Sequence, residues 1–123
     1  MALVLCTGRN PVLLYTPKLI LEGAGHSVIA TENESAVKTI CRQYQFDVAV
    51  IGQTLSPEDK RKVFSAVREC CPSTKVLELF AEFHGRTLQE AGSWLQVPVD
   101  APGKLAQRVA ELLSENSSTK TYS

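Results

Sequence analysis

The stretch FDVAVI at residues 46–51 decides the fold, because it is the clearest buried strand of this 123-residue chain. Short runs rich in Val, Ile and Phe are typical of strands that are covered on both faces of a sheet. Soon after it, Ser56 is predicted to cap a helix in which Pro57 occupies the first position. A buried strand that leads directly into a helix indicates one unit of a parallel α/β sheet.

The same alternation extends outward in both directions. Further strands are predicted at residues 2–6, 26–30, 75–80 and 94–97. One further helix is predicted to begin near Asn10, with a kink or a new start at Pro17, and another near Asn33. A short helix is predicted over residues 86–91. The last helix is predicted to begin at a cap formed by Asp100, with Pro102 in its first turn. Strict alternation with short turns requires parallel strands joined by right-handed crossovers. We therefore predict an α/β fold of three layers, an α/β/α sandwich around a five-stranded parallel sheet.

Composition and charge indicate one globular domain. Hydrophobic residues make up 44% of the chain and charged residues 21%, which is ordinary for a domain of this length. The domain is predicted to cover residues 1–113, and the polar segment 114–123 is predicted to be a disordered tail. Because 13 basic residues balance 13 acidic ones, the basic surface of a nucleic-acid-binding protein is missing. We expect neither nucleic acid nor a membrane as a partner.

Cellular location is inferred from apolar runs and from cysteines. No apolar run approaches the ~20 residues that span a bilayer, and residues 1–7 lack the basic leader of a secretory signal. The four cysteines, Cys6, Cys41, Cys70 and Cys71, have no CxxC spacing. We expect a cytoplasmic protein with reduced thiols, three of them packed as small apolar side chains.

Three parts of the chain together resemble a known family. They are LEGAGHSV at residues 21–28, FDVAVIGQTLSP at residues 46–57, and the pairs Ala91-Gly92 and Val97-Pro98 on either side of the last predicted strand. In order and spacing they resemble the receiver domain of two-component response regulators, over residues 2–113. The resemblance implies a flavodoxin-like, CheY-like sheet with the strand order 2-1-3-4-5.

The resemblance also indicates which residues stand at the family's chemical positions. An active receiver accepts phosphate from a histidine kinase on an aspartate after the third strand, and an acidic pair after the first strand holds a divalent metal. Here the acceptor position is Gly52, the acidic pair is Cys6 and Thr7, and the conserved hydroxyl and lysine are Phe80 and Val97. Since Mg²⁺ requires oxygen ligands that include carboxylates, we expect no metal. The chain resembles a pseudo-receiver with no cofactor and no enzymatic activity.

Protein binding is the output that this resemblance implies. In the family, the face made by helix 4, strand 5 and helix 5 carries partner contacts and dimerisation. Carried over to this chain, that face comprises Arg86, Gln89, Glu90, Trp94, Lys104, Gln107, Arg108 and Glu111. A mixed polar rim of this kind suits a transient interface. We expect a protein partner in two-component signalling, and a homodimer.

Cys6 supports an alternative from another class. A Cys-Thr-Gly sequence after the first strand is similar to the loop of low-molecular-weight tyrosine phosphatases, and a cysteine there also serves the IIB carriers of sugar phosphotransferase systems. The phosphatase requires an arginine six positions further on, where this chain has Val12. A small α/β enzyme or phosphocarrier using Cys6 is therefore the alternative. Capture of a small ligand in the altered pocket is a third hypothesis.

Two charged residues remain outside these schemes. Glu78 is predicted in the middle of an apolar strand, so either its face of the strand is partly open or a lysine or arginine pairs with it. Arg9 follows the first strand but forms no basic stripe with Lys18 or Arg42. Because only Gly8 follows that strand and a phosphate-binding loop needs repeated glycines, nucleotide binding is not predicted.

Overall fold

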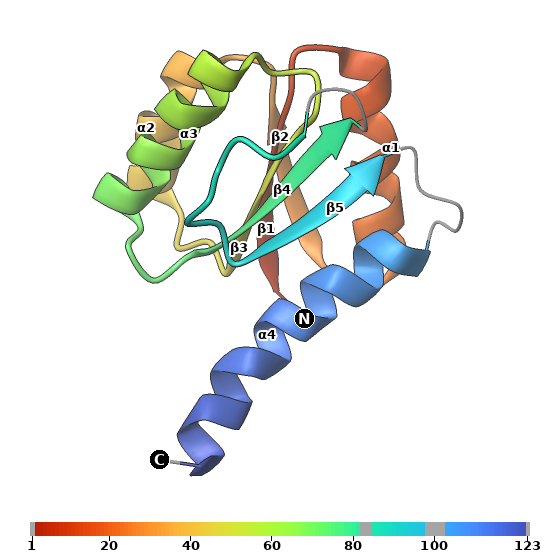
Figure 1. The fold of residues 1–123 in the computed structure, drawn as a ribbon, viewed down its shortest axis with the longest axis vertical. Helices are drawn as coiled ribbons and strands as arrows, with labels where there is room; N and C mark the ends of the chain where they lie inside the picture. Colours follow the sequence, from red (N-terminus) through yellow and green to blue (C-terminus); the bar gives the residue numbers. More distant parts are fainter. Residues whose placement is uncertain (1, 82–84, 98–102, 123) are drawn as a thin grey trace.

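The core of the molecule is one parallel sheet of five strands (Figure 1). The computed structural model describes residues 2–81, 85–97 and 103–122. The strands are β1 (Leu3–Thr7), β2 (Ser27–Thr31), β3 (Val48–Ile51), β4 (Lys75–Ala81) and β5 (Ser93–Val97). They are parallel and lie in the order β2-β1-β3-β4-β5. The predicted α/β fold and its strand order are confirmed.

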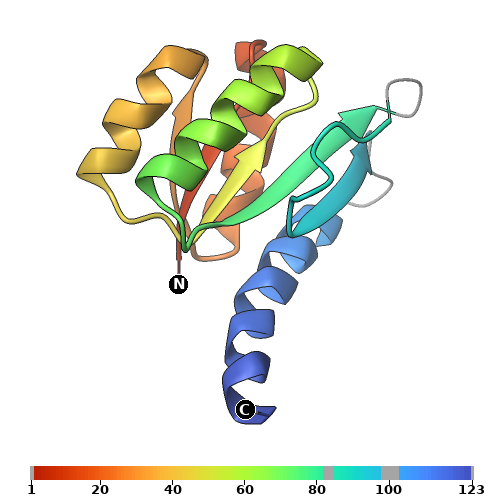
Figure 2. The same ribbon diagram turned by 60° about the vertical axis from the view of Figure 1, so that its left-hand side comes forward.

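Helices cover both faces of this sheet, as Figure 2 shows. They are α1 (Pro11–Gly23), the 3₁₀ turn η1 (Glu34–Ala36), α2 (Val37–Gln43), α3 (Pro57–Cys70) and α4 (Gly103–Tyr122). Helices α2 and α3 pack on one face, where Val37 and Val63 are fully buried. Helices α1 and α4 pack on the other face through Leu21 and Val109. The three predicted layers are therefore present.

Local sequence signals place the helix starts. The side chain of Asn10 accepts hydrogen bonds from the amides of Val12 and Leu13, and Ser56 accepts one from the amide of Asp59. A proline follows each cap at the first position of α1 and α3, where its missing N–H has no intrahelical partner to lose. Pro17 lies inside α1, so the predicted alternative of a new helix start at Pro17 is wrong. The Asn10 cap already fixes the first turn.

The predicted short helix over residues 86–91 is absent, and the segment between Gly85 and Gly92 is an irregular connection. Groups outside the segment take its backbone hydrogen bonds. The Glu78 carboxylate accepts from the amides of Thr87 and Leu88, and the Trp94 indole donates to the Leu88 carbonyl. The Gly92 amide donates to the carbonyl of Val76 on β4. A helix that begins near Arg86 would need the Leu88 carbonyl for the Gly92 amide, so these bonds compete with it.

A buried ion pair fixes Glu78 in this role. Lys60 Nζ of α3 lies 2.7 Å from Glu78 Oε2 and 2.8 Å from the Leu79 carbonyl. Their side chains are 5% and 0% exposed, respectively. Of the two sequence-based alternatives for Glu78, pairing with a basic residue is therefore confirmed. The pair joins α3, β4 and the segment 85–92.

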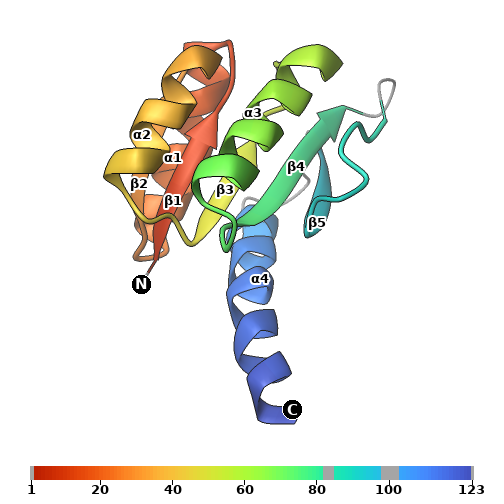
Figure 3. The same cartoon turned by 90° about the vertical axis from the view of Figure 1, so that its left-hand side faces the viewer.

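The C-terminal helix is longer than expected. Helix α4 continues to Tyr122, through most of the segment 114–123 that the composition predicts to be disordered. Its C-terminal half projects away from the sheet, as Figure 3 shows. Extending an existing helix costs far less than starting one, so a polar sequence can continue a helix that Leu105 and Leu112 anchor. The predicted cap at Asp100 and Pro102 lies outside the described residues.

We predict that Lys60→Met destabilises the protein by about 3–5 kcal/mol, because it leaves a buried carboxylate without its counter-charge. The double variant Lys60→Met/Glu78→Gln should lose less, since a neutral amide oxygen still accepts from the Leu88 amide. Urea unfolding followed by circular dichroism measures both. The matched control is Lys38→Met, which removes an ion pair between half-exposed side chains and should cost under about 1 kcal/mol. Equal losses in Lys60→Met and Lys38→Met would contradict this account.

Candidate functional site at the carboxyl edge of the sheet

Three of the five residues at the receiver positions meet where β1 and β3 end. Cys6 and Thr7 close β1, and Gly52 follows β3 directly. The register pairs Thr7 with Ile51, and the Gly52 amide donates to the Thr7 carbonyl oxygen at 2.9 Å. The Thr7 hydroxyl donates to the Val50 carbonyl at 3.1 Å and is buried. The backbones of the two strand ends are therefore held together tightly.

Gly52 has no space for a side chain. A Cβ atom added there would lie 2.4 Å from the Thr7 carbonyl oxygen and 3.4 Å from Cα of Gly8. Both neighbours are backbone atoms, which cannot rotate away as the end of a side chain can. The position that the receiver resemblance assigns to the phosphate acceptor therefore has no space for a Cβ atom and carries no carboxylate.

The space beneath this edge is small. A cavity of about 10 Å³ is lined by Cys6, Leu14, Leu79 and other residues of the two strand ends and α1. That volume is about what one water molecule requires. No carboxylate belongs to the described residues that line the cavity. A cavity of this volume does not hold a metabolite.

Cys6 is a buried thiol in this environment. It is 1% exposed. Burial raises the pKa of the Cys6 thiol to about 12, and the negative charge of Glu22 acts in the same direction. A reactive cysteine requires a stabilised thiolate. The surroundings of Cys6 have the opposite effect.

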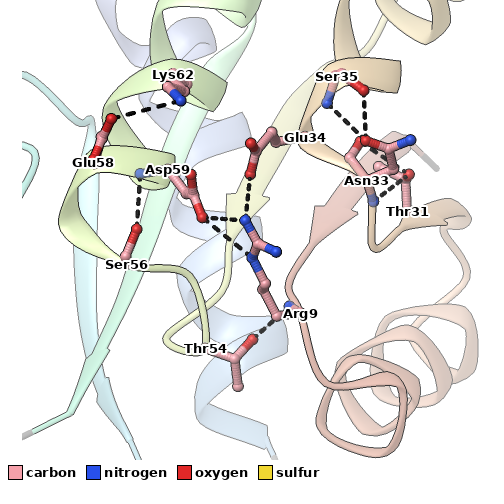
Figure 4. Close-up of polar contacts among 10 residues, drawn as sticks. All are labelled: Arg9, Thr31, Asn33, Glu34, Ser35, Thr54, Ser56, Glu58, Asp59 and Lys62. Carbon is pink, nitrogen blue, oxygen red and sulfur yellow. Dashed lines mark hydrogen bonds and ion pairs between the residues drawn. The ribbon is translucent and has the colours of Figure 1, made fainter.

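A charged cluster spans the loops above the cavity, and Figure 4 shows its geometry. Arg9 lies in the loop after β1. Its Nε and Nη2 atoms both donate to the Asp59 carboxylate, with a distance of 3.1 Å from Nε. Its Nη2 atom also donates to the Glu34 carboxylate at 2.9 Å. The Arg9 amide donates to the Thr54 hydroxyl at 2.7 Å. The hydrogen bonds from the Arg9 guanidinium hold the pKa of the Asp59 carboxyl below its usual range. Arg9 therefore joins the loops after β1 and β3 to η1.

Sequence reasoning missed this cluster. Arg9 has no basic neighbour in the sequence, so it gives no patch signal, and its two carboxylate partners lie 25 and 50 residues away. One usable signal was present, because Asp59 occupies the third position of a helix capped by Ser56, where carboxylates are favoured. That signal predicts an acidic helix start and does not identify the cation.

Phe80 and Val97 lie further along the same edge, on β4 and β5. They are not among the described residues that line the cavity below Cys6. The guanidinium carbon of Arg86 lies 5.7 Å from the centroid of the Phe80 ring. Val97 instead packs with the core residues on the side of the sheet that α1 and α4 cover. The two side chains therefore face opposite sides of the sheet. The five positions share an edge, and in the described part of the chain the cavity is lined by Cys6, Thr7 and Gly52 of the five.

The predicted partner face lacks the short helix that was expected over residues 86–91. Arg86, Gln89 and Glu90 are exposed on the irregular segment, and the Arg86 guanidinium stacks 4.8 Å from the Trp94 ring centroid. Arg108 of α4 donates to the Ser93 hydroxyl at 3.3 Å, and Gln107 bonds Glu111. Lys104, Gln107 and Glu111 are exposed. These side chains are polar and exposed, and Trp94 is half-buried against the segment 85–92.

The described residues give no sign of a metal site or of a membrane-spanning helix. Within residues 2–81, 85–97 and 103–122, no group of three His, Cys, Asp or Glu side chains is arranged to hold a metal ion. In the same ranges, no helix has the length and apolar content that a membrane span needs. The four cysteines are free thiols.

Similarity to known proteins is found at the level of three-dimensional structure. No protein-family model and no curated protein sequence matches the chain. Its structure matches a CheY-like receiver domain protein from Methanospirillum hungatei with a TM-score of 0.80 at 18% identity, over 97% of this chain and 98% of the other. A response regulator from Thermotoga maritima matches with a TM-score of 0.78 at 21% identity, over 93% and 98%. A signal receiver domain from Vibrio parahaemolyticus matches with a TM-score of 0.80 at 15% identity, over 98% and 96%. The chain therefore has the fold of response-regulator receiver domains.

Proposed function

We propose that this protein is a receiver-like module of two-component signalling that binds other proteins and is not phosphorylated. The observation that carries the proposal is the closed backbone at Gly52, where a Cβ would lie 2.4 Å from the Thr7 carbonyl oxygen. An aspartate cannot stand there without moving β1. The fold supports a signalling role, and the blocked acceptor position supports a role without phosphoryl transfer.

The charges at the sheet edge support the same proposal. Active receivers bring carboxylates together at this edge, and a bound cation relieves their repulsion. Here Cys6 and Thr7 are buried and uncharged, and the guanidinium of Arg9 pairs with the carboxylates of both Glu34 and Asp59. Positive charge is therefore supplied by a covalently attached group. A site of this kind is complete without a metal ion or a phosphate and has one stable arrangement.

Binding would use the surface that includes Arg86, Gln89, Glu90, Lys104, Gln107 and Glu111. These polar side chains are exposed around the half-buried Trp94, which matches the polar rim and aromatic centre of transient interfaces. Four free cysteines are consistent with action in the cytoplasm. We infer that the level of the protein or of its partner sets the output.

Substitution of Gly52 tests the closed backbone. Gly52→Ala should destabilise the protein by about 3 kcal/mol, because the added methyl group forces apart two hydrogen-bonded strand ends. Gly23→Ala is the matched control. No atom lies within 4 Å of a Cβ at Gly23, which ends α1, so this change should be neutral or stabilise by about 0.5 kcal/mol. Thermal unfolding compares the two, and an unaffected Gly52→Ala variant would refute the closed site.

Phosphorylation can be tested directly. After incubation with acetyl phosphate and Mg²⁺, intact-mass spectrometry should find no added phosphoryl group on this protein, because Asp59 is held by Arg9 and Gly52 has no side chain. An active receiver treated in parallel should gain one. If this protein gained a phosphoryl group that peptide mapping placed on an aspartate at the sheet edge, the proposal would be wrong.

Thiol labelling tests the alternative that Cys6 is a nucleophile or phosphocarrier. With a pKa of about 12, only about one Cys6 in 10⁴ is a thiolate at pH 8. Iodoacetamide should therefore label the half-exposed Cys70 first and leave Cys6 unlabelled until urea unfolds the chain. Peptide mapping identifies the labelled residue. Rapid labelling of Cys6 below pH 8.5 in the folded protein would restore the enzymatic alternative.

A further inference from the structure

Three of the four cysteines gather where α2 and α3 end. Cys41 lies in the last turn of α2, Cys70 is the last residue of α3, and Cys71 caps that helix. All three belong to the core between these helices and the sheet, whereas Cys6 lies in the core on the opposite face. Helices α2 and α3 lie side by side on one face of the sheet (Figure 2). Two cysteines that are 30 positions apart in the sequence, Cys41 and Cys71, therefore meet in the structure.

The contact between Cys41 and Cys71 is direct. The Cys71 thiol donates to the main-chain carbonyl oxygen of Cys41 at 3.2 Å, and it lies 3.7 Å from the carbonyl oxygen of Tyr44. At standard bond lengths, the first distance places the Cys71 sulfur within about 6 Å of the Cys41 Cα atom. The two residues are 4% and 1% exposed, respectively, so both thiols lie in one buried site.

An ion pair beside the thiols helps to fix the register of the two helices. Lys38 Nζ of α2 lies 3.0 Å from Glu69 Oε2 of α3. Lys38 comes about one helical turn before Cys41, and Glu69 comes just before the two adjacent cysteines. The Cys71 amide donates to the Val67 carbonyl at 2.7 Å, so the last turn of α3 holds its backbone. Both helices therefore keep Cys41 and Cys71 in contact.

The surroundings keep this pair reduced under ordinary conditions. Burial raises the pKa of the Cys41 thiol to about 12, and the neighbouring Cys71 and Cys70 thiols act in the same direction. The Cys71 thiol faces two carbonyl oxygens, which accept its proton and would repel a thiolate. Because the thiolate is the reactive form of cysteine, the pair reacts slowly and responds only to prolonged oxidation.

We propose that Cys41 and Cys71 form a reversible disulfide when the protein is exposed to a peroxide. A disulfide joins cysteines whose Cα atoms are about 4.4–6.8 Å apart, so it links residues that already contact one another. Hydrogen peroxide converts one thiol to a sulfenic acid and releases water. The sulfur of the second thiol then displaces the hydroxyl group, which leaves with the thiol proton as a second water. The two sulfurs together lose two electrons, which the two peroxide oxygens gain.

The disulfide would lock α2 to α3. Helix α2 has seven residues, and a helix this short depends on its tertiary contacts. At the other end of the helix pair, Arg9 bridges Glu34 of η1, which leads into α2, and Asp59 of α3. The disulfide and the Arg9 bridge would together hold the pair at both ends. Disulfides that form only on oxidation are the kind that sense redox state in proteins with otherwise reduced thiols.

Peptide mapping after peroxide treatment tests the proposal. The folded protein is kept overnight in about 1 mM hydrogen peroxide, remaining thiols are blocked with iodoacetamide, and trypsin is applied without reductant. The tryptic peptide 39–42, which contains Cys41, should be recovered linked to the peptide 69–75, and dithiothreitol should separate the two. The melting temperature of the linked protein should rise by about 10 °C, because the closed loop restricts the unfolded chain. A lower melting temperature would contradict a link between residues already in contact.

Three alanine variants identify the pair. Peptide 69–75 also contains Cys70, so Cys70→Ala should retain the link, whereas Cys71→Ala should abolish it. Cys6→Ala is the matched control, since Cys6 is an equally buried thiol in the other core cluster and should leave the link unchanged. Circular dichroism checks that each variant is folded. Because Cys70 is only partly buried, Cys70→Ala keeps the test decisive even if Cys71→Ala fails to fold.

Three results would overturn the disulfide between Cys41 and Cys71. They are the absence of linked peptides from treated wild type, a link that is lost in Cys70→Ala, and a link that survives in folded Cys71→Ala. The inference does not rest on the proposed signalling function, because none of these measurements involves phosphorylation or a protein partner.

Discussion

The hydrogen bond between the Gly52 amide and the Thr7 carbonyl is the constraint on which the site depends. At 2.9 Å it joins the end of β1 to the residue after β3, and the backbone of Gly52 is oriented so that an added Cβ atom would lie 2.4 Å from the same carbonyl oxygen. A backbone contact of this kind cannot be opened by a change of rotamer. The consequences extend below and above it: the cavity beneath shrinks to about the volume of one water, and the loops above are close enough for Arg9 to bridge Asp59 and Glu34. In the described part of this edge, the strand ends are packed together and Arg9 is paired with two carboxylates.

The first turn of α3 connects this edge to the rest of the sheet. Asp59 and Lys60 are adjacent in the sequence, and they point to different partners. Asp59 binds Arg9 at the ends of β1 and β3, and Lys60 binds Glu78 in β4, whose carboxylate holds the Thr87 and Leu88 amides. One helical turn thus ties four loops and strands into a single unit. A buried ion pair tolerates little displacement, because separating its charges in a medium of low dielectric constant is costly. Such a unit favours one conformation over a two-state switch.

Sequence reasoning succeeded where local signals and tertiary contacts agree. The Asn10 and Ser56 caps, the buried run ending at Ile51 and the alternation of elements were enough for the topology. It failed at residues 86–91, because the competing acceptor and donor, Glu78 and Trp94, come from strands and cannot be paired by local pattern. At Pro17 the alternative of a new helix start is wrong, because the Asn10 cap seven residues earlier already begins the helix. The sequence shows that position 52 lacks a carboxylate. It does not show that a Cβ atom there would lie 2.4 Å from the Thr7 carbonyl oxygen, because that distance depends on the three-dimensional structure.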